Sequence, residues 1–377
     1  MKCASFEKKL CRSCDLLDRS YTETLKLKEE NLKSLFPDSS HLVLKTIGVT
    51  ASAEHSRSKA KLAVYGTLEN IRFGFFNAQG DPQSLEECPL HISGINELLP
   101  VLRSLLEKHR ITPYDINTRQ GAIKYLIVTK SESSGEIMIR FVLRSKDMLD
   151  PLKRLSLELR LSHPEVKVTT ANIQPIPHAI VEGDEEIVLT EQSAIQHQFD
   201  EFSLNLGPRS FFQVTPEIAK ELYRTFADRV QRDQPKTLLD LYCGVGAFSF
   251  YASRGNTQVT GIELSREAVV CAELTQSDLQ IKNIQFHALD VEQVLKSSNE
   301  HYEAILANPP RRGLNDSIIS SLLRLDPKWI YYSSCNAVTL SRDYAALSAK
   351  YFVESLQIFD LFPYTSHYET FLVLKRK

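Results

Sequence analysis

The sequence predicts an α/β protein of two domains, and three observations support this. The chain has 377 residues, which is enough for two domains. In its first half, strand patterns follow one another across turns, which is typical of an α+β domain with an antiparallel sheet. After residue 215, strands and helices alternate, which favours a Rossmann-like, doubly wound parallel sheet. Periodicity weakens over residues 185–207, so we expect domains over residues 1–195 and 196–377.

In the first half, alternation of apolar residues predicts strands and a spacing of three or four predicts helices. Asp150 before Pro151 marks an expected helix start. The expected elements are a helix over 21–35, strands over 62–68 and 70–76, a helix over 95–109, strands over 122–130 and 136–144, a helix over 150–161 and a strand over 166–174.

The second half opens with a helix whose apolar positions Ile218, Leu222, Phe226 and Val230 have helical spacing. The following elements are expected to be strand 237–242, helix 247–253, strand 258–263, helix 266–279, strands 284–287, 304–307 and 329–332, and helix 337–350. Two last strands, 352–359 and 368–375, are joined by a short turn that contains proline, so we expect an antiparallel hairpin at one edge of the sheet.

Composition indicates an ordinary globular protein, with 42% hydrophobic and 24% charged residues. The net charge of −2 means that any nucleic-acid surface must be a local basic patch. The start of the chain has basic residues but no apolar stretch typical of a secretory signal, and no apolar run is long enough to span a membrane. We therefore expect a cytoplasmic protein whose seven cysteines form no disulfide framework.

A glycine-rich turn predicts the cofactor site. Gly244 and Gly246 follow a strand and precede a helix, where backbone N–H groups can approach a ligand. Glu263 ends the next strand and could bind ribose hydroxyls, Asp290 ends the third and could meet an adenine edge, and Tyr242 could lie against adenine. A surface acid and a buried strand aromatic are alternative interpretations of Glu263 and Tyr242. Because a third glycine is absent, S-adenosylmethionine fits better than a dinucleotide.

The reacting site is predicted at the ends of the next two strands. Asn308, before two prolines, could bind a nucleobase or the cofactor, or belong to a rigid turn. Cys335 lies between a strand and a helix start, where the helix dipole is expected to lower the pKa of the thiol. Its thiolate could add to C6 of a pyrimidine so that C5 accepts a methyl group. Glu369 is the candidate base for the C5 proton, or else an exposed edge-strand acid.

A metal site is predicted at the N-terminus. Cys3, Cys11 and Cys14 have seven and then two residues between them, and Cys88 precedes Pro89. Four thiolates suit either tetrahedral zinc or an iron–sulfur cluster, and the spacing does not choose between them.

Taken together, the motifs resemble those of the RNA uracil-C5 methyltransferases over essentially the whole chain. They are Cys3, Cys11, Cys14 and Cys88, Ser210-Phe211-Phe212-Gln213, the turn from Asp240 to Gly246, the turn from Asn308 to Gly313, Ser333-Ser334-Cys335-Asn336 and His367-Tyr368-Glu369. The resemblance is closest to the short bacterial enzymes that make 5-methyluridine in 23S ribosomal RNA. It implies a class I S-adenosylmethionine-dependent methyltransferase domain, and a [4Fe–4S] cluster held by the four cysteines of the N-terminal α+β domain. It also implies that Gln213, Tyr242, Glu263 and Asn308 contact S-adenosylmethionine, with Cys335 as the nucleophile and Glu369 as the base.

This sequence departs from the family pattern in places. The first cluster cysteine is residue 3, so we expect no N-terminal RNA-binding barrel. RNA would then be held by the first half, with Arg57, Lys59, Lys61, Arg119 and Lys124 as candidates or as a merely solvated basic face. Thr215 and Asn308 replace an asparagine and an aspartate common in relatives. The expected partner is a loop or single-stranded uridine of 23S ribosomal RNA, because unstacking is easier there; no membrane or protein partner is implied, and a monomer is expected.

Three alternatives stay open. A transfer-RNA uracil-C5 methyltransferase is disfavoured by the four N-terminal cysteines, which those relatives lack. A catalytically silent, metal-containing RNA-binding protein is disfavoured by the intact Cys335, Glu369 and glycine pair. A cytosine-C5 methyltransferase would usually employ two active-site cysteines, whereas only Cys335 is suitably placed.

Overall fold

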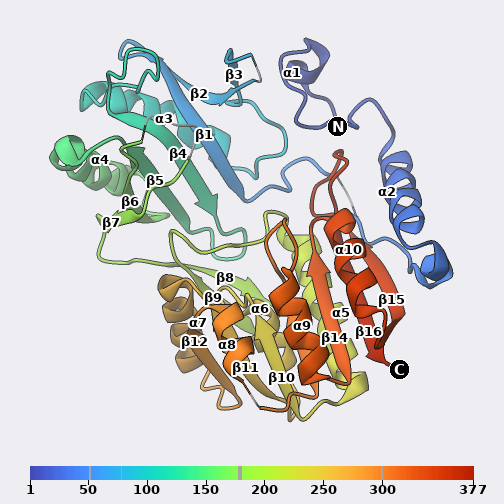
Figure 1. Cartoon of the computed structure of the whole chain (residues 1–377). Helices are drawn as coiled ribbons and strands as arrows, with labels where there is room; N and C mark the ends of the chain where they lie inside the picture. Colours follow the sequence, from blue (N-terminus) through green and yellow to red (C-terminus); the bar gives the residue numbers. More distant parts are fainter. Residues whose placement is uncertain (51, 78, 177–180, 299) are drawn as a thin grey trace. The chain divides into compact units, whose positions relative to one another are not determined.

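The computed structural model describes residues 1–50, 52–77, 79–176, 181–298 and 300–377 (Figure 1). Its contacts divide the chain into two compact units. The first comprises Met1–Arg12, Ser52–Gln198 and Leu206–Pro208, and the second comprises Ser13–Ala51, Phe199–Asn205 and Arg209–Lys377. Residues 13–51 therefore group with the C-terminal unit, whereas a single boundary at residue 195 would assign them to the N-terminal domain.

The first unit is built on a seven-stranded sheet in the order β3-β2-β1-β4-β5-β6-β7. Its elements are α1 (Ala4–Glu7), β1 (Lys59–Thr67), β2 (Asn70–Phe76), β3 (Pro82–Ser84), α3 (Ile95–Lys108), β4 (Ile123–Lys130), β5 (Ile137–Leu143), η2 (Lys146–Met148), α4 (Leu149–Ser162), β6 (Val166–Ile173) and β7 (Glu185–Val188). Helices α3 and α4 bury leucines such as Leu102 and Leu155 in the same core as the sheet.

The predicted antiparallel sheet is confirmed except at one pair, because β5 and β6 run parallel. The helix α4 lies between them in the chain and carries it back, as a parallel connection requires. This helix begins at Leu149 after the short 3-10 turn η2, so Asp150 lies in its first turn instead of capping it.

The second unit contains α2 (Tyr21–Leu35), η1 (Pro37–Leu42), α5 (Pro216–Asp233), β10 (Thr237–Leu241), α6 (Ala247–Ala252), β11 (Gln258–Glu263), α7 (Arg266–Asp278), β12 (Ile284–Ala288), α8 (Val291–Ser297), β13 (Ala304–Ala307), α9 (Asp316–Leu325), β14 (Trp329–Ser334), α10 (Ala337–Leu347), β15 (Tyr351–Phe359) and β16 (Glu369–Arg376). Near the boundary between the units, β8 (Ile195–Phe199) and β9 (Phe202–Leu206) form a two-stranded sheet. The sequence prediction missed α8, α9 and this β8–β9 pair.

The sheet of the second unit has the order β12-β11-β10-β13-β14-β16-β15. The first five strands are parallel, and β16 is antiparallel to β14 and β15, which confirms the predicted edge hairpin. Strands β11 and β12 lie on one side of β10, and the strands from β13 onward lie on its other side, so the strand order reverses between β10 and β13. This reversal is the place where doubly wound sheets bind ligands, at the carboxyl ends of the strands. Figure 1 shows α8, α9 and α10 along one face of this sheet.

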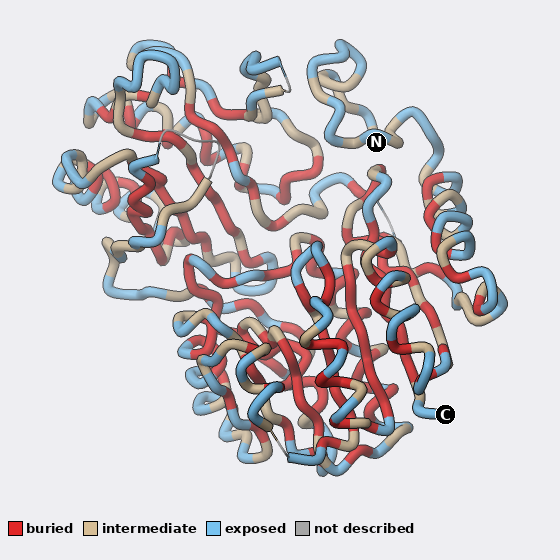
Figure 2. Tube along the Cα trace, viewed as in Figure 1, coloured by how far each residue is buried: buried red, intermediate tan, exposed pale blue. Residues whose placement is uncertain are grey.

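Helix α2 belongs to the second unit because its apolar residues enter the core of that unit. Ser20 and Glu23 form a capping box at its start, and Leu32 and the following Phe36 are buried in the cluster that contains the residues of β13 and β14. Figure 2 shows the central strands of the sheet as buried and the outer surfaces of the helices as exposed. In the part of the chain that the structure describes, no helix is both long and apolar enough to cross a membrane.

Candidate active site

The turn between β10 and α6 has an unusual backbone. Tyr242, Gly244 and Gly246 have φ values of 62°, 57° and 83°. This left-handed region is rarely adopted by residues other than glycine, so Tyr242 is held in a strained conformation by its surroundings. Every second residue from Tyr242 to Gly246 thus has a positive φ, and the chain makes a tight turn at the carboxyl edge of the sheet.

The two glycines of this turn are required for different reasons. A Cβ atom at Gly246 would lie 2.6 Å from Cζ of Phe286, so glycine there permits close packing of helix on strand. A Cβ atom at Gly244 would meet nothing within 4 Å. Gly244 therefore borders open space, into which a bound molecule could approach the backbone.

Glu263, at the end of β11, holds the turn in place. Its carboxylate accepts hydrogen bonds from the N–H groups of Gly244 (3.2 Å) and Ser265 (2.8 Å). The half-buried side chain of Glu263 thus lies beside the open space at Gly244. Its predicted role in binding ribose hydroxyls stays a prediction.

Asp240 was not predicted as a site residue, although it lies in β10 just before the turn. It is fully buried, and its Oδ2 accepts a hydrogen bond from Ser249 (2.6 Å). Its Oδ1 has no partner in the described structure. Burial raises the pKa of Asp240 to about 7. A buried carboxylate oxygen without a partner in the described structure calls for a donor, which can be a water molecule or a group of a ligand.

The other predicted cofactor residues have mixed surroundings. Asp290 lies two residues beyond β12 and caps α8 by accepting from the N–H of Gln293 (2.9 Å), so it has a structural role of its own. Asn308 follows β13, and its N–H donates to the carbonyl of Leu241 (3.3 Å), which ties it to the β10 edge. Gln213 is buried in the segment before α5. Thr215 donates its hydroxyl to the carbonyl of Leu361 (2.9 Å) instead of capping α5.

Cys335 lies between β14 and α10, as predicted, but the expected lowering of its pKa is wrong. Asn336 is the N-cap and accepts from the N–H groups of the first turn, so Cys335 lies outside the helix. Burial and the negative charge of Glu369 raise the pKa of Cys335, whereas a hydrogen bond from Arg311 and its charge lower it. The helix dipole falls off within one turn and does not overcome burial here.

Glu369 is the first residue of β16 and is buried, which corrects its interpretation as an exposed edge acid. The hydroxyl of Ser333 donates to its Oε1 (2.5 Å). Burial raises the pKa of Glu369 to about 7, and the bond from Ser333 opposes that rise. Ser334 and Thr370 are cross-strand partners in the antiparallel pair β14–β16, so Cys335, which follows Ser334, and Glu369, which precedes Thr370, lie at the same end of that pair.

Two further residues of this cluster were missed by sequence reasoning. Ser333 was treated only as part of a motif, and its bond to Glu369 depends on the antiparallel pairing of β14 with β16. Arg311 was treated only as part of the turn from Asn308 to Gly313, whereas its hydrogen bond to Cys335 makes it a neighbour of the nucleophile. Neither contact has a local sequence signal, since the partners are far apart in the chain.

The four N-terminal cysteines form no disulfide among the described residues. Burial raises the pKa of Cys88, and the charges of Cys3 and Cys11, which belong to the same unit, add to that rise. Cys14 is grouped with the second unit. Within the residues that the structure describes, no group of three or more His, Cys, Asp or Glu side chains is arranged to hold a metal ion. The metal site therefore stays a prediction.

Two of the basic residues predicted to hold RNA are engaged within the first unit. Lys124 is buried and donates to the carbonyl of Ile176 (2.6 Å), so it is not a surface cation. Lys61 forms an ion pair with Glu182 (2.8 Å).

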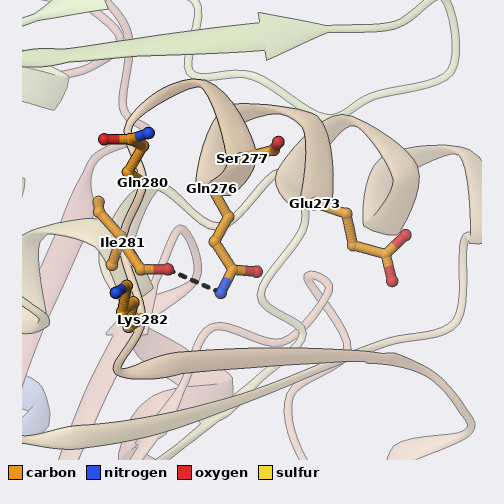
Figure 3. Close-up of a pocket in the computed structure, with 6 residues that line it drawn as sticks. All are labelled: Glu273, Gln276, Ser277, Gln280, Ile281 and Lys282. Carbon is orange, nitrogen blue, oxygen red and sulfur yellow. Dashed lines mark hydrogen bonds between the residues drawn. The ribbon is translucent and has the colours of Figure 1, made fainter.

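A surface depression elsewhere in the second unit contains none of the predicted site residues. It is lined by residues at the end of α7 and just after it, Glu273, Gln276, Ser277, Gln280, Ile281 and Lys282. Figure 3 shows the Gln276 amide donating to the carbonyl of Ile281 (3.0 Å). The depression adds nothing to the cluster around Cys335, because the glycine-rich turn and β14 contribute no residue to it.

Comparisons with known proteins agree on one family. A family model described as tRNA (Uracil-5-)-methyltransferase matches residues 20–377. A Yersinia pseudotuberculosis protein named 23S rRNA (uracil(747)-C(5))-methyltransferase RlmC is 39% identical over 379 residues, covering 100% of both chains. A Yersinia pestis protein of the same name is also 39% identical, with the same coverage.

A solved structure shares the fold. The crystal structure of Pyrococcus abyssi tRNA (uracil-54, C5)-methyltransferase in complex with S-adenosyl-L-homocysteine has a TM-score of 0.80 and 22% identity, and the match covers 96% of this chain and 85% of that one. The predicted α/β methyltransferase fold is thereby confirmed. With its full-length match to curated relatives and its cysteine and glutamate at one sheet edge, the chain belongs to the tRNA (uracil-5-)-methyltransferase family.

Proposed function

We propose that this protein transfers a methyl group from S-adenosylmethionine to C5 of a uridine in 23S ribosomal RNA. The observation that carries the proposal is that the β14–β16 register brings Cys335 and buried Glu369 to the carboxyl edge of the sheet that also holds the glycine-rich turn. A nucleophile, a base with a pKa near neutrality and an open backbone turn are the parts that this reaction needs.

The reaction proceeds in steps that conserve atoms and charge. The Cys335 thiolate adds to C6 of the uracil, which makes C5 nucleophilic. C5 then bonds to the methyl carbon of S-adenosylmethionine, and the sulfonium leaves as neutral S-adenosylhomocysteine. Glu369 removes the proton from C5, the C5–C6 double bond forms again, and the thiolate departs from C6.

The charges of the cluster favour this order. Thiolate and carboxylate repel each other, and Arg311 compensates for one negative charge near Cys335. When sulfur bonds to C6, the negative charge moves to the uracil as an enolate, and methyl transfer from the cationic sulfonium then neutralises it, so an ionised Glu369 is less costly at the step that removes the proton. With a pKa of about 7, Glu369 can accept the C5 proton and release it to solvent near neutral pH.

Several features support binding of S-adenosylmethionine beside this cluster. The open space at Gly244 would let S-adenosylmethionine approach the backbone of the turn. The unpartnered Oδ1 of Asp240 could accept a hydrogen bond from the ammonium group of the same cofactor. Glu263 is the candidate for ribose hydroxyls. Leu264 and Leu289, which are 69% and 49% exposed just beyond β11 and β12, could cover the faces of an adenine ring. Gln213, Tyr242, Asp290 and Asn308 remain proposed contacts.

Ribosomal RNA is favoured over transfer RNA by the relatives named for 23S rRNA, which match over 100% of their length at 39% identity. The Pyrococcus abyssi enzyme named for transfer RNA is 22% identical. The test is to incubate the protein with unmodified 23S rRNA and with unmodified tRNA, and to measure 5-methyluridine by mass spectrometry. We expect methylation of the ribosomal RNA, in a loop or unpaired segment. Methylation of tRNA alone would contradict the proposed substrate.

We further propose that Cys3, Cys11, Cys14 and Cys88 hold a [4Fe–4S] cluster. The proposal is supported by the effect of the charges of Cys3 and Cys11 on the pKa of Cys88 in the same unit, and thiolates are the usual ligands of such clusters. Methyl transfer from a sulfonium needs no electrons, so the cluster would organise the N-terminal segment. Elemental analysis of anaerobically purified protein should give iron and sulfide; zinc without either would contradict the cluster.

A further inference from the structure

The segment between β15 and β16, residues 360–368, leads directly into Glu369 and is bound along its length by residues that precede or form α2. We call it the base loop. Its first residue, Asp360, follows Phe359, which is the cross-strand partner of Glu369. The two ends of the base loop therefore meet at the proposed base, and a movement at either end would displace the carboxylate.

The first anchor is a buried ion pair. Nζ of Lys28 lies 2.6 Å from Oδ1 of Asp360, and the two side chains are 1% and 0% exposed. The same ammonium group donates to the carbonyl of Phe362 (3.1 Å), and the hydroxyl of Tyr21 donates to the other oxygen of Asp360 (2.7 Å). Tyr21 and Lys28 are seven residues apart, which places them on one face of α2.

A buried ion pair is an expensive way to hold two elements together, since both charges leave water. Apolar residues of similar size would pack α2 against the sheet as well or better. What an ion pair with several hydrogen bonds adds is a defined geometry, because each donor must meet its acceptor. The pair thus indicates that the position of the base loop matters beyond stability.

The remaining anchors lie further along the base loop. The N–H of Leu16 donates to the carbonyl of Tyr364 (3.0 Å), and Asp15 accepts from the N–H of Ser366 (3.0 Å). The hydroxyl of Tyr368, the residue before Glu369, donates to Asn31 on α2 (2.6 Å).

Gly48 adds an independent sign that the contact is built closely. A Cβ atom at this position would lie 2.5 Å from the hydroxyl oxygen of Tyr21, so any side chain there would push on the residue that binds Asp360. The N–H of Val49 donates to the same hydroxyl (3.0 Å), and Ile47 bonds to Ile358 and Asp360 through its backbone.

We propose that α2 and the residues before it act as a positioning clamp, in which Lys28, Tyr21 and Asn31 fix the base loop so that Glu369 meets the C5 proton of the methylated adduct. This inference rests on the proposed function. None of the three residues is a catalytic residue, since each acts through the base loop.

The clamp predicts a defect in one chemical step. Addition of Cys335 and methyl transfer do not need Glu369, but proton removal does. A misplaced base should therefore slow product release from the covalent adduct without slowing its formation. A purely structural role of α2 would instead lower all steps together, through loss of folded protein.

The test variant is the double substitution Lys28→Met, Asp360→Asn, which leaves no unpaired buried charge. Lys26→Met is the matched control, because Lys26 is exposed on the same helix. Two rates are measured on folded protein: covalent trapping by RNA that contains 5-fluorouridine, which does not need proton removal, and methylation of ordinary RNA. We expect trapping within about twofold of the wild type, methylation at least tenfold slower, and accumulation of methylated adduct on ordinary RNA.

Parallel loss of both rates, or no change in either, would overturn the clamp. Should the double variant not fold, Tyr21→Phe and Asn31→Ala are judged by the same ratio of rates. Wild-type protein and Glu369→Gln serve as references. If the wild type neither methylates RNA nor is trapped, the proposed function fails; if both references behave as expected and only the clamp variants do not, the clamp alone fails.

Discussion

The two ends of the base loop carry carboxyl groups that are equally buried and differently partnered. Asp360 is 0% exposed and is bound by the ammonium of Lys28 and the hydroxyl of Tyr21. Glu369 is 2% exposed, and its carboxylate accepts a hydrogen bond from the neutral hydroxyl of Ser333. Asp360, beside the cation of Lys28, holds the base loop against α2. Glu369 has no cation bonded to its carboxyl group in the described structure, and burial raises its pKa to about 7, so it can gain and lose a proton near neutral pH.

The largest effect on the methylation rate is expected from removing the sulfur atom of Cys335. Cys335→Ala should lower methylation by roughly 10⁴-fold or more, because no other group of the cluster can add to C6. Methyl incorporation into unmodified RNA measures this. Cys271→Ala is the control, since Cys271 is buried in α7 and should leave the rate unchanged. Near-normal methylation by Cys335→Ala would mean that the nucleophile is another group.

Glu369→Gln should lower turnover by roughly 10²–10⁴-fold, the range typical of a lost general base. Since glutamine cannot take the proton from C5, ordinary RNA should remain bound to the protein as a methylated adduct, visible on a denaturing gel. Glu273→Gln, at an exposed position of α7, is the control. Loss of turnover without any adduct would place the defect before methyl transfer and argue against the role of Glu369.

Stability should respond in opposite directions at the two ends of the base loop. Asp360→Asn leaves Lys28 buried without its partner and should destabilise the fold by about 3–5 kcal/mol. Glu369 has a pKa raised from 4.5 to about 7, so the folded state binds more protons than the unfolded state between those values. Its contribution is therefore most favourable below pH 4.5 and is lost as pH rises through 7.

Thermal unfolding checks this contrast. Glu369→Gln should gain stability relative to the wild type as pH rises from 5 to 8, since glutamine stays neutral. Destabilisation by Glu369→Gln that grows with pH, or stabilisation by Asp360→Asn, would contradict the assignment of the two carboxyls.

The smallest effect is expected from Ser333→Ala. The serine hydroxyl lowers the pKa of Glu369, so its loss should raise that pKa and move the rise of the pH–rate profile for proton removal to higher pH. At pH 8 the rate should fall by less than about tenfold. The pH dependence of adduct decay measures this shift. An unchanged profile would mean that the serine does not control the base.

The sequence predicted most of the second unit because its signals are local. The periodicity of β10 to α7, the glycines of the turn and the terminal hairpin are each contained in short segments. The contact of Ser333 with Glu369 spans 36 residues and that of Lys28 with Asp360 spans 332, so only the folded chain brings them together. The pKa of Cys335 was mispredicted for a related reason, because burial and Glu369 outweigh the local helix dipole.

The most direct test of the account is to identify the protein atom that bonds to the base. RNA containing 5-fluorouridine is incubated with the protein and S-adenosylmethionine, the adduct is digested with protease and nuclease, and the modified peptide is sequenced by mass spectrometry. We predict a methylated, fluorinated nucleotide on the sulfur of Cys335 and on no other residue. A nucleotide attached elsewhere, or methylation of ordinary RNA without any trapping by fluorinated RNA, would contradict the account.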